Sequence, residues 1–167
     1  MRRIIAVCFI FFLAIPGLVL SKSTEINQKK EENFSKVVSL AKLLFSNKIL
    51  RGEDGIIQKY SMFKQIGSAQ QIQVEVTLSD GLMLMVLDTL VLTPNGLILI
   101  EEAQGMPKLK YDVTLTSLGN FLVNSRDSAS KFISRECRLV NGKTSCIKTI
   151  IGQNGSTTII KYSQIKP

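Results

Sequence analysis

Hydrophobic and polar residues alternate strictly between Ile72 and Leu78. The apolar members share one face of an extended segment, and polar residues take the other face. This period of two is typical of a half-buried strand. The Asp80-Gly81 pair that follows favours a two-residue type I′ turn. With Ser79 paired to Leu82, apolar residues of the two strands lie opposite one another: Leu78 and Met83, Val76 and Met85, Val74 and Leu87.

The next segment, residues 82–92, is apolar at nearly every position. Such a strand is expected to be covered on both faces. The sequence Thr93-Pro94-Asn95-Gly96 then predicts a three-residue hairpin loop, because proline presets a turn and glycine supplies a left-handed residue. In that register Leu92 lies opposite Ile98, and Leu90 lies opposite Ile100. The three strands together form an antiparallel meander.

Residues 25–50 have helical periodicity. Apolar residues recur on one face at spacings of three and four (Phe34, Val37, Val38, Ala41, Leu44 and Phe45). Arg51-Gly52 is a common stop for a helix. We expect this helix to cover one face of the meander, although a helix that binds a partner would have the same pattern.

The chain beyond the meander contains several short apolar segments separated by turn residues. Strands are predicted over 110–116, 121–123, 132–140, 143–151 and 157–162, and residues 56–66 fit either a strand or a short helix. The fold class is therefore α+β: one long N-terminal amphipathic helix packed on a large antiparallel β-meander. Residues 24–167 form a single domain, with the helix at 25–50 and a β-rich part at 56–163.

The N-terminus has the parts of a secretory signal peptide. Arg2-Arg3 precedes an apolar run over 4–20, and small polar residues follow at 21–23. Residues 1–23 are predicted to be removed, which places the protein in the periplasm or the secreted space. The alternative is an uncleaved segment that anchors the chain, because the run is close to the length that spans a bilayer.

Two of the three cysteines flank a turn. Cys137 and Cys146 lie at equal distances from Asn141-Gly142, which favours a type I′ hairpin. If Val140 pairs with Lys143, the two cysteines lie directly opposite each other, within the range that a disulfide requires. The sequence predicts a disulfide-stapled C-terminal hairpin, as in oxidising compartments.

The chain contains no histidine, which excludes Ser-His-Asp triads, Cys-His pairs and histidine-ligated metals. Carboxylates remain as candidates for chemistry. In the two predicted registers Glu75, Asp88 and Glu102 share one face of the sheet. Carboxylates so close together raise one another's pKa or bind a cation such as calcium, whereas the simpler alternative is that they are solvated.

Charge is distributed unevenly along the chain. Residues 65–107 contain no lysine or arginine, whereas residues 108–167 contain ten basic and three acidic residues. The cysteine hairpin register places Arg135 opposite Lys148, with Arg138 and Lys143 on the other face. These four residues are candidates for binding an anion, or they form a solvated basic face.

These observations favour an exported binding or structural module without enzymatic activity, which contacts an anionic envelope component or another protein through the basic hairpin. Nucleic acid is a poor candidate partner, because aromatic residues that stack on bases are sparse, and membrane contact is expected only through an uncleaved N-terminal segment. No cofactor is predicted.

One alternative is a carrier that holds an apolar ligand between helix and sheet, suggested by the Met83, Met85 and Leu87 face. The other is an enzyme or calcium site built on the three carboxylates.

Overall fold

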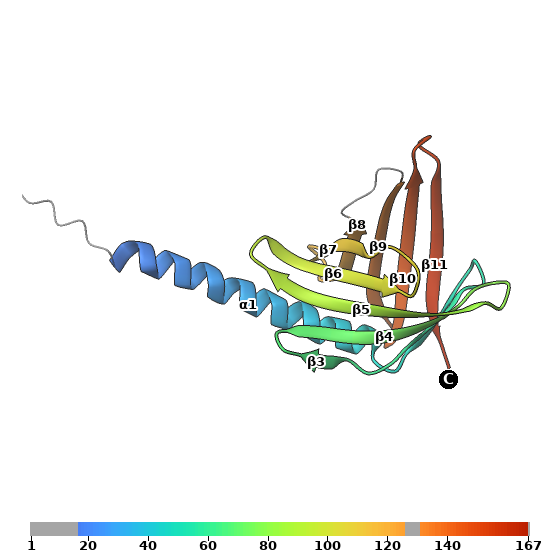
Figure 1. Ribbon diagram of the computed structural model, residues 1–167, viewed down its shortest axis with the longest axis horizontal. Helices are drawn as coiled ribbons and strands as arrows, with labels where there is room; N and C mark the ends of the chain where they lie inside the picture. Colours follow the sequence, from blue (N-terminus) through green and yellow to red (C-terminus); the bar gives the residue numbers. More distant parts are fainter. Residues whose placement is uncertain (1–16, 126–130, 167) are drawn as a thin grey trace, which may run out of the picture.

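The computed structural model describes residues 17–125 and 131–166. Within these residues, one helix, α1 (Gly17–Phe45), precedes eleven strands (Figure 1). The strands are β1 (Ile49–Gly52), β2 (Ile57–Tyr60), β3 (Lys64–Ile66), β4 (Ala69–Thr77), β5 (Met83–Thr93), β6 (Gly96–Ala103), β7 (Leu109–Leu115), β8 (Phe121–Ser125), β9 (Lys131–Val140), β10 (Lys143–Gly152) and β11 (Thr157–Ile165).

The strands of the described residues close into an antiparallel β-barrel. Their order is β2-β1-β11-β10-β9-β8-β7-β6-β5-β4-β3, and an additional pairing of β2 with β4 joins the two ends. Ten strands form the ring, and β3 pairs only with the start of β4. In Figure 1, β4–β6 run along the direction of the helix and β9–β11 run across it, as expected when a twisted sheet closes on itself. The expected meander is thus confirmed as part of a larger closed structure.

The helix ends earlier than its periodicity predicts. It stops at Phe45 rather than residue 50, because Asn47 takes a left-handed conformation (φ 54°) that reverses the chain. Residues 49–52 then form β1, which pairs with β11 and β2. The predicted helix had included most of this strand, whose apolar pair Ile49-Leu50 fits either periodicity.

The second half of α1 fills one end of the barrel instead of covering one face of a meander. Val37, Ala41 and Leu44 are fully buried, and they share one core with residues that project inward from the strands, among them Leu90, Val113, Phe121 and Tyr162. A closed barrel of about eight strands is filled by its own side chains, so a ring of ten leaves more room inside. The first half of α1 extends away from the strands (Figure 1).

Two predicted hairpin registers are wrong by one residue. Thr77 pairs with Met83, and the Leu78 amide donates to the Leu82 carbonyl, so residues 79–81 form a three-residue β4–β5 loop in which only Gly81 has positive φ. Thr93 pairs with Gly96, so the β5–β6 loop contains two residues rather than three. A shift of one residue moves every side chain of a strand to the opposite face. Leu84, Val86 and Asp88 therefore face the interior.

The outer face of β5 is correspondingly open. Met83 and Met85 are 59% and 47% exposed, so the prediction that this strand is covered on both faces is wrong. The methionines also do not form the predicted apolar surface beneath the helix. The neighbouring residues of β5, Leu84 and Val86, face the interior instead.

The third hairpin has the predicted register. Val140 pairs with Lys143, and Asn141 and Gly142 both have positive φ, as a type I′ turn requires. Cys137 and Cys146 lie opposite each other with Cα atoms 4.1 Å apart and form a disulfide. Both cysteines are buried inside the barrel, so the staple belongs to the core.

Most of the predicted signal segment, residues 1–23, lies outside the described residues. Across the described part of the chain, no helix combines the length and the apolar character needed to cross a membrane.

Candidate functional site

A cavity of about 210 Å³ opens at the barrel end away from the helix. It lies near the β4–β5 turn and the loop after β6, and its walls come from seven strands and their turns. The wall is largely apolar (Ile56, Val74, Val76, Leu78, Leu84, Val86, Ala103 and Met106). These side chains face inward because of the observed registers, since Val76 pairs with Leu84 and Val86 with Ala103.

The same cavity contains four charged side chains in two cross-strand pairs. Asp88 on β5 lies opposite Glu101 on β6, and Arg135 on β9 lies opposite Lys148 on β10. Like charges directly opposite each other destabilise a sheet unless something offsets them. Here the acidic pair and the basic pair line the same hollow.

Tyr60 connects the basic pair to β2. The Nη1 atom of Arg135 donates to the Tyr60 hydroxyl over 3.4 Å, and that hydroxyl donates to Oε1 of Gln58 over 2.8 Å. The first of these distances is long for a hydrogen bond. Burial raises the pKa of Tyr60 to about 12, so the phenol is neutral at physiological pH.

Asp88 is only 7% exposed, and its Oδ1 atom has no hydrogen-bond partner among the described residues. Burial, and secondly the negative charge of Glu101, raise the pKa of Asp88 to about 7, although Arg135 opposes this shift. A buried polar atom without a partner is unusual, because it loses its hydration without replacing it. Asp88 therefore changes protonation near neutral pH.

Burial lowers the pKa of Arg135, but Tyr60, Glu101 and Asp88 outweigh this effect and raise it above its usual value. Its side chain is partly accessible and reaches the open cavity. The guanidinium is thus a permanent cation at the inner end of an apolar hollow.

A second hollow lies on the helix side of these residues. It holds only about 20 Å³ of free space, and α1 contributes Ala41 and Phe45 to its lining. Tyr60, Asp88 and Arg135 line both hollows. These three side chains, here called the partition, separate the open cavity from the packed core around the helix.

The structure divides the predicted basic group into two parts. Arg135 and Lys148 face the interior, so neither belongs to a solvated outer face. Arg138 and Lys143 are exposed on the outside, near the turn of the hairpin. The four residues do not form one surface patch.

The predicted acidic group is also divided. Glu75 and Glu102 lie on the outward side, 4.0 Å from Lys59 and 2.8 Å from Lys108 respectively, whereas Asp88 lies inside. Its acidic neighbour is Glu101, which the wrong β5–β6 register had assigned to the other face. Among the described residues, no three side chains of His, Cys, Asp or Glu gather as a metal site requires.

Tyr60, Gln58 and Glu101 were not predicted as site residues. Glu101 follows Leu97 and Leu99 with a spacing of two, and this alternation could have placed it on the inner face. No signal in the sequence brings Tyr60 to Arg135, because they are separated by 75 positions in the chain and meet only when the barrel closes.

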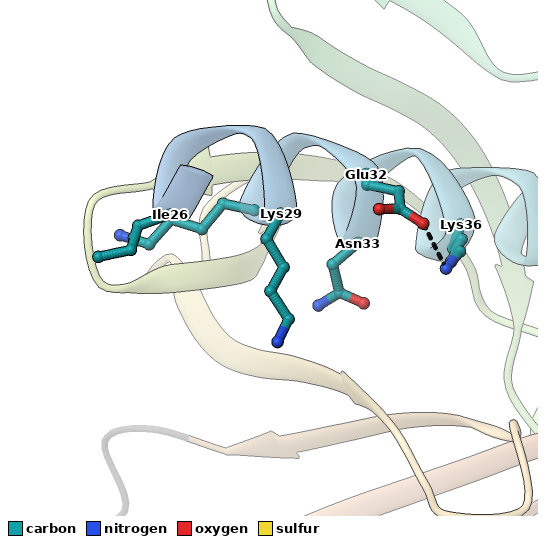
Figure 2. A pocket seen from close by; sticks show the side chains of 6 residues that line it. Ile26, Lys29, Glu32, Asn33 and Lys36 are labelled. Carbon is teal, nitrogen blue, oxygen red and sulfur yellow. Dashed lines mark ion pairs between the residues drawn. The ribbon is translucent and has the colours of Figure 1, made fainter. Parts of the chain in front are cut away.

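A wider hollow of about 560 Å³ lies along the outward side of α1, over residues 26–36. Figure 2 shows its lining side chains, among them Ile26, Lys29, Glu32, Asn33 and Lys36, spread along this single helix. Glu32 and Lys36 form an ion pair of 2.7 Å on the exposed surface. Within the described part of the chain, this lining comes from a single helix, which cannot enclose a ligand, so the barrel cavity is the better candidate.

The chain matches no family model, and no curated protein sequence matches it.

Proposed function

We propose that this protein is an exported, non-enzymatic binding protein that carries a small amphipathic ligand in its barrel cavity. One observation supports this most directly: an apolar-walled cavity ends at a buried polar partition in which one oxygen of Asp88 has no partner within the described part of the chain. Ligand pockets are typically lined by apolar side chains together with a few convergent polar groups.

The size of the cavity suits this role. An apolar cavity of about 150 Å³ is large enough to bind benzene, and this one holds about 210 Å³. Ligand pockets for drug-sized molecules usually begin at about 300 Å³. The ligand is therefore slender, or it extends out of the open end.

Binding is tested with N-phenyl-1-naphthylamine, a neutral probe whose fluorescence increases in apolar surroundings. We expect saturable binding of one probe per protein. Leu84→Trp, which places an indole in the cavity, should weaken binding at least tenfold. Met85→Trp adds the same side chain to the exposed side of β5 and should leave binding unchanged. Equal effects of the two variants, with both still folded, would contradict the proposal.

Export is the second part of the proposal, and the buried disulfide supports it because such bonds persist in oxidising compartments. The test is the intact mass of the protein purified from its own host without reductant. We expect a mass that lacks the first 21 or 23 residues and a further two hydrogens. A full-length mass with free thiols would contradict export.

A further inference from the structure

The partition contains more hydrogen-bonding capacity than its neighbours use. A guanidinium has five N–H donors, and Arg135 makes one long hydrogen bond, to Tyr60, among the described residues. Asp88, which lines the same cavity, has a buried oxygen that no described residue hydrogen-bonds. Both groups lie at the inner end of an apolar channel, where the polar end of a ligand would lie.

The chemistry of the inner end indicates the sign of that polar end. Arg135 is a cation there, and among the described residues its guanidinium makes only the one long hydrogen bond to Tyr60. Because a carboxylate accepts charge-assisted hydrogen bonds from a guanidinium, a ligand with a single negatively charged head group fits this end of the cavity.

We infer that the ligand is a chain-like monoanion, such as a medium-chain fatty acid, whose carboxylate lies between Arg135 and Asp88 and whose chain lies along the apolar wall. This inference rests on the proposed function. The carboxylate accepts hydrogen bonds from the Arg135 guanidinium and from the protonated Asp88 carboxyl. Charge-assisted hydrogen bonds of this kind are stronger than neutral ones.

Binding is therefore coupled to proton uptake by Asp88. The groups that face it are the negative Glu101 on β6, the positive Arg135 on β9, and the neutral phenols of Tyr60 on β2 and Tyr111 on β7. Lys148 on β10 lines the same cavity, and α1 contributes only apolar side chains, Ala41 and Phe45. A bound anion adds a second negative neighbour and favours the protonated carboxyl.

The coupling gives a definite sign to the pH dependence. Burial and Glu101 hold the pKa of Asp88 at about 7 in the empty protein. Below this pH the proton is already present, and the affinity for the anion should be constant. Above it each binding event must take up a proton, so the dissociation constant should rise by up to about tenfold per pH unit.

The test uses isothermal titration calorimetry to measure the dissociation constants of decanoate, decanol and decyltrimethylammonium at pH 6.0–8.5. All three ligands are kept below micelle-forming concentrations. We expect decanoate to bind at least tenfold more tightly than the other two at pH 6, with an affinity that falls as the pH rises. Asp88→Asn should remove this pH dependence. Arg135→Gln should weaken decanoate binding at least tenfold and weaken decanol binding much less, whereas Arg138→Gln, an exposed change on the same strand, should alter neither.

The outcomes separate the two proposals. Tighter binding of decyltrimethylammonium, or equal binding of decanoate and decanol at every pH, would overturn the assignment of an anion but leave the carrier function intact. Failure of all three ligands and of the neutral probe to bind would overturn the carrier function itself. The comparison of ligands with the wild-type protein decides the question even if Arg135→Gln does not fold.

Discussion

Asp88 combines burial, an unpartnered oxygen and an acidic neighbour in a single side chain. Each feature disfavours the charged form. The pKa of this carboxyl is about 7 in the folded protein and near 4 in an unfolded chain. The folded state thus binds more protons between these values, and the contribution of Asp88 to stability falls as the pH rises from about 4 through 7.

Asp88→Asn should therefore be most stabilising, relative to wild type, at high pH. The difference in the free energy of unfolding between Asp88→Asn and the wild type should grow from pH 4 to pH 8. It should reach several kcal/mol at most, because one pKa unit corresponds to about 1.4 kcal/mol. Urea denaturation at each pH measures it. Glu53→Gln, at an exposed position, serves as the control. Parallel stability curves for wild type and Asp88→Asn would contradict the prediction.

At the scale of elements, the hairpin of β9 and β10 joins the helix to the barrel. Its disulfide is buried, and the Thr144 hydroxyl on β10 donates to the carbonyl of Leu44 over 2.6 Å. Carbonyls in the last turn of a helix have no partner within the helix. This hairpin therefore fixes the end of α1 and also contributes Arg135 and Lys148 to the cavity.

Replacement of both Cys137 and Cys146 by alanine should lower the free energy of unfolding by about 2–3 kcal/mol, because the bond restricts a short loop in the unfolded chain. The measurement is urea denaturation with and without reductant. Reductant should lower the stability of the wild type by a similar amount and leave the double variant unchanged. A wild type whose stability is the same in reductant, with the bond shown to be reduced, would refute this role.

At the scale of the whole molecule, ten of the described strands form a barrel that has different contents at its two ends. The helix fills one end with apolar side chains, and the other end remains open. The partition lies between them and takes its three residues from β2, β5 and β9. The width of the barrel thus provides both the space for the helix and the space for a ligand.

Ala41 lies where the helix is fully enclosed. Ala41→Leu should lower the free energy of unfolding by about 1–3 kcal/mol, because extra methyl groups force a filled core to shift. Lys42→Leu, on the exposed side of the same turn, should change it by less than about 0.5 kcal/mol. Urea denaturation at a fixed pH compares the two. Similar values for both variants would mean that the helix is not enclosed.

Much of the fold could be predicted from local pattern, and the errors have a common physical origin. The register at Asn141-Gly142 was predicted correctly, because two adjacent residues that tolerate positive φ leave few alternatives. Asp80-Gly81 and Pro94-Asn95 fit loops of two or three residues equally well. The choice between these loops determined which of Glu101 and Glu102 faces the interior.

Local spacing along the chain specifies most of the antiparallel strands, the amphipathic helix, the cysteine pair and the cross-strand pair of Arg135 and Lys148. Closure of the sheet, the entry of the helix into the barrel and the meeting of Asp88, Tyr60 and Arg135 depend on contacts between distant segments. Closure requires the β2–β4 pairing and depends on how many strands the ring contains. Which face becomes the interior follows from that closure and from the turn registers, and not from any one segment.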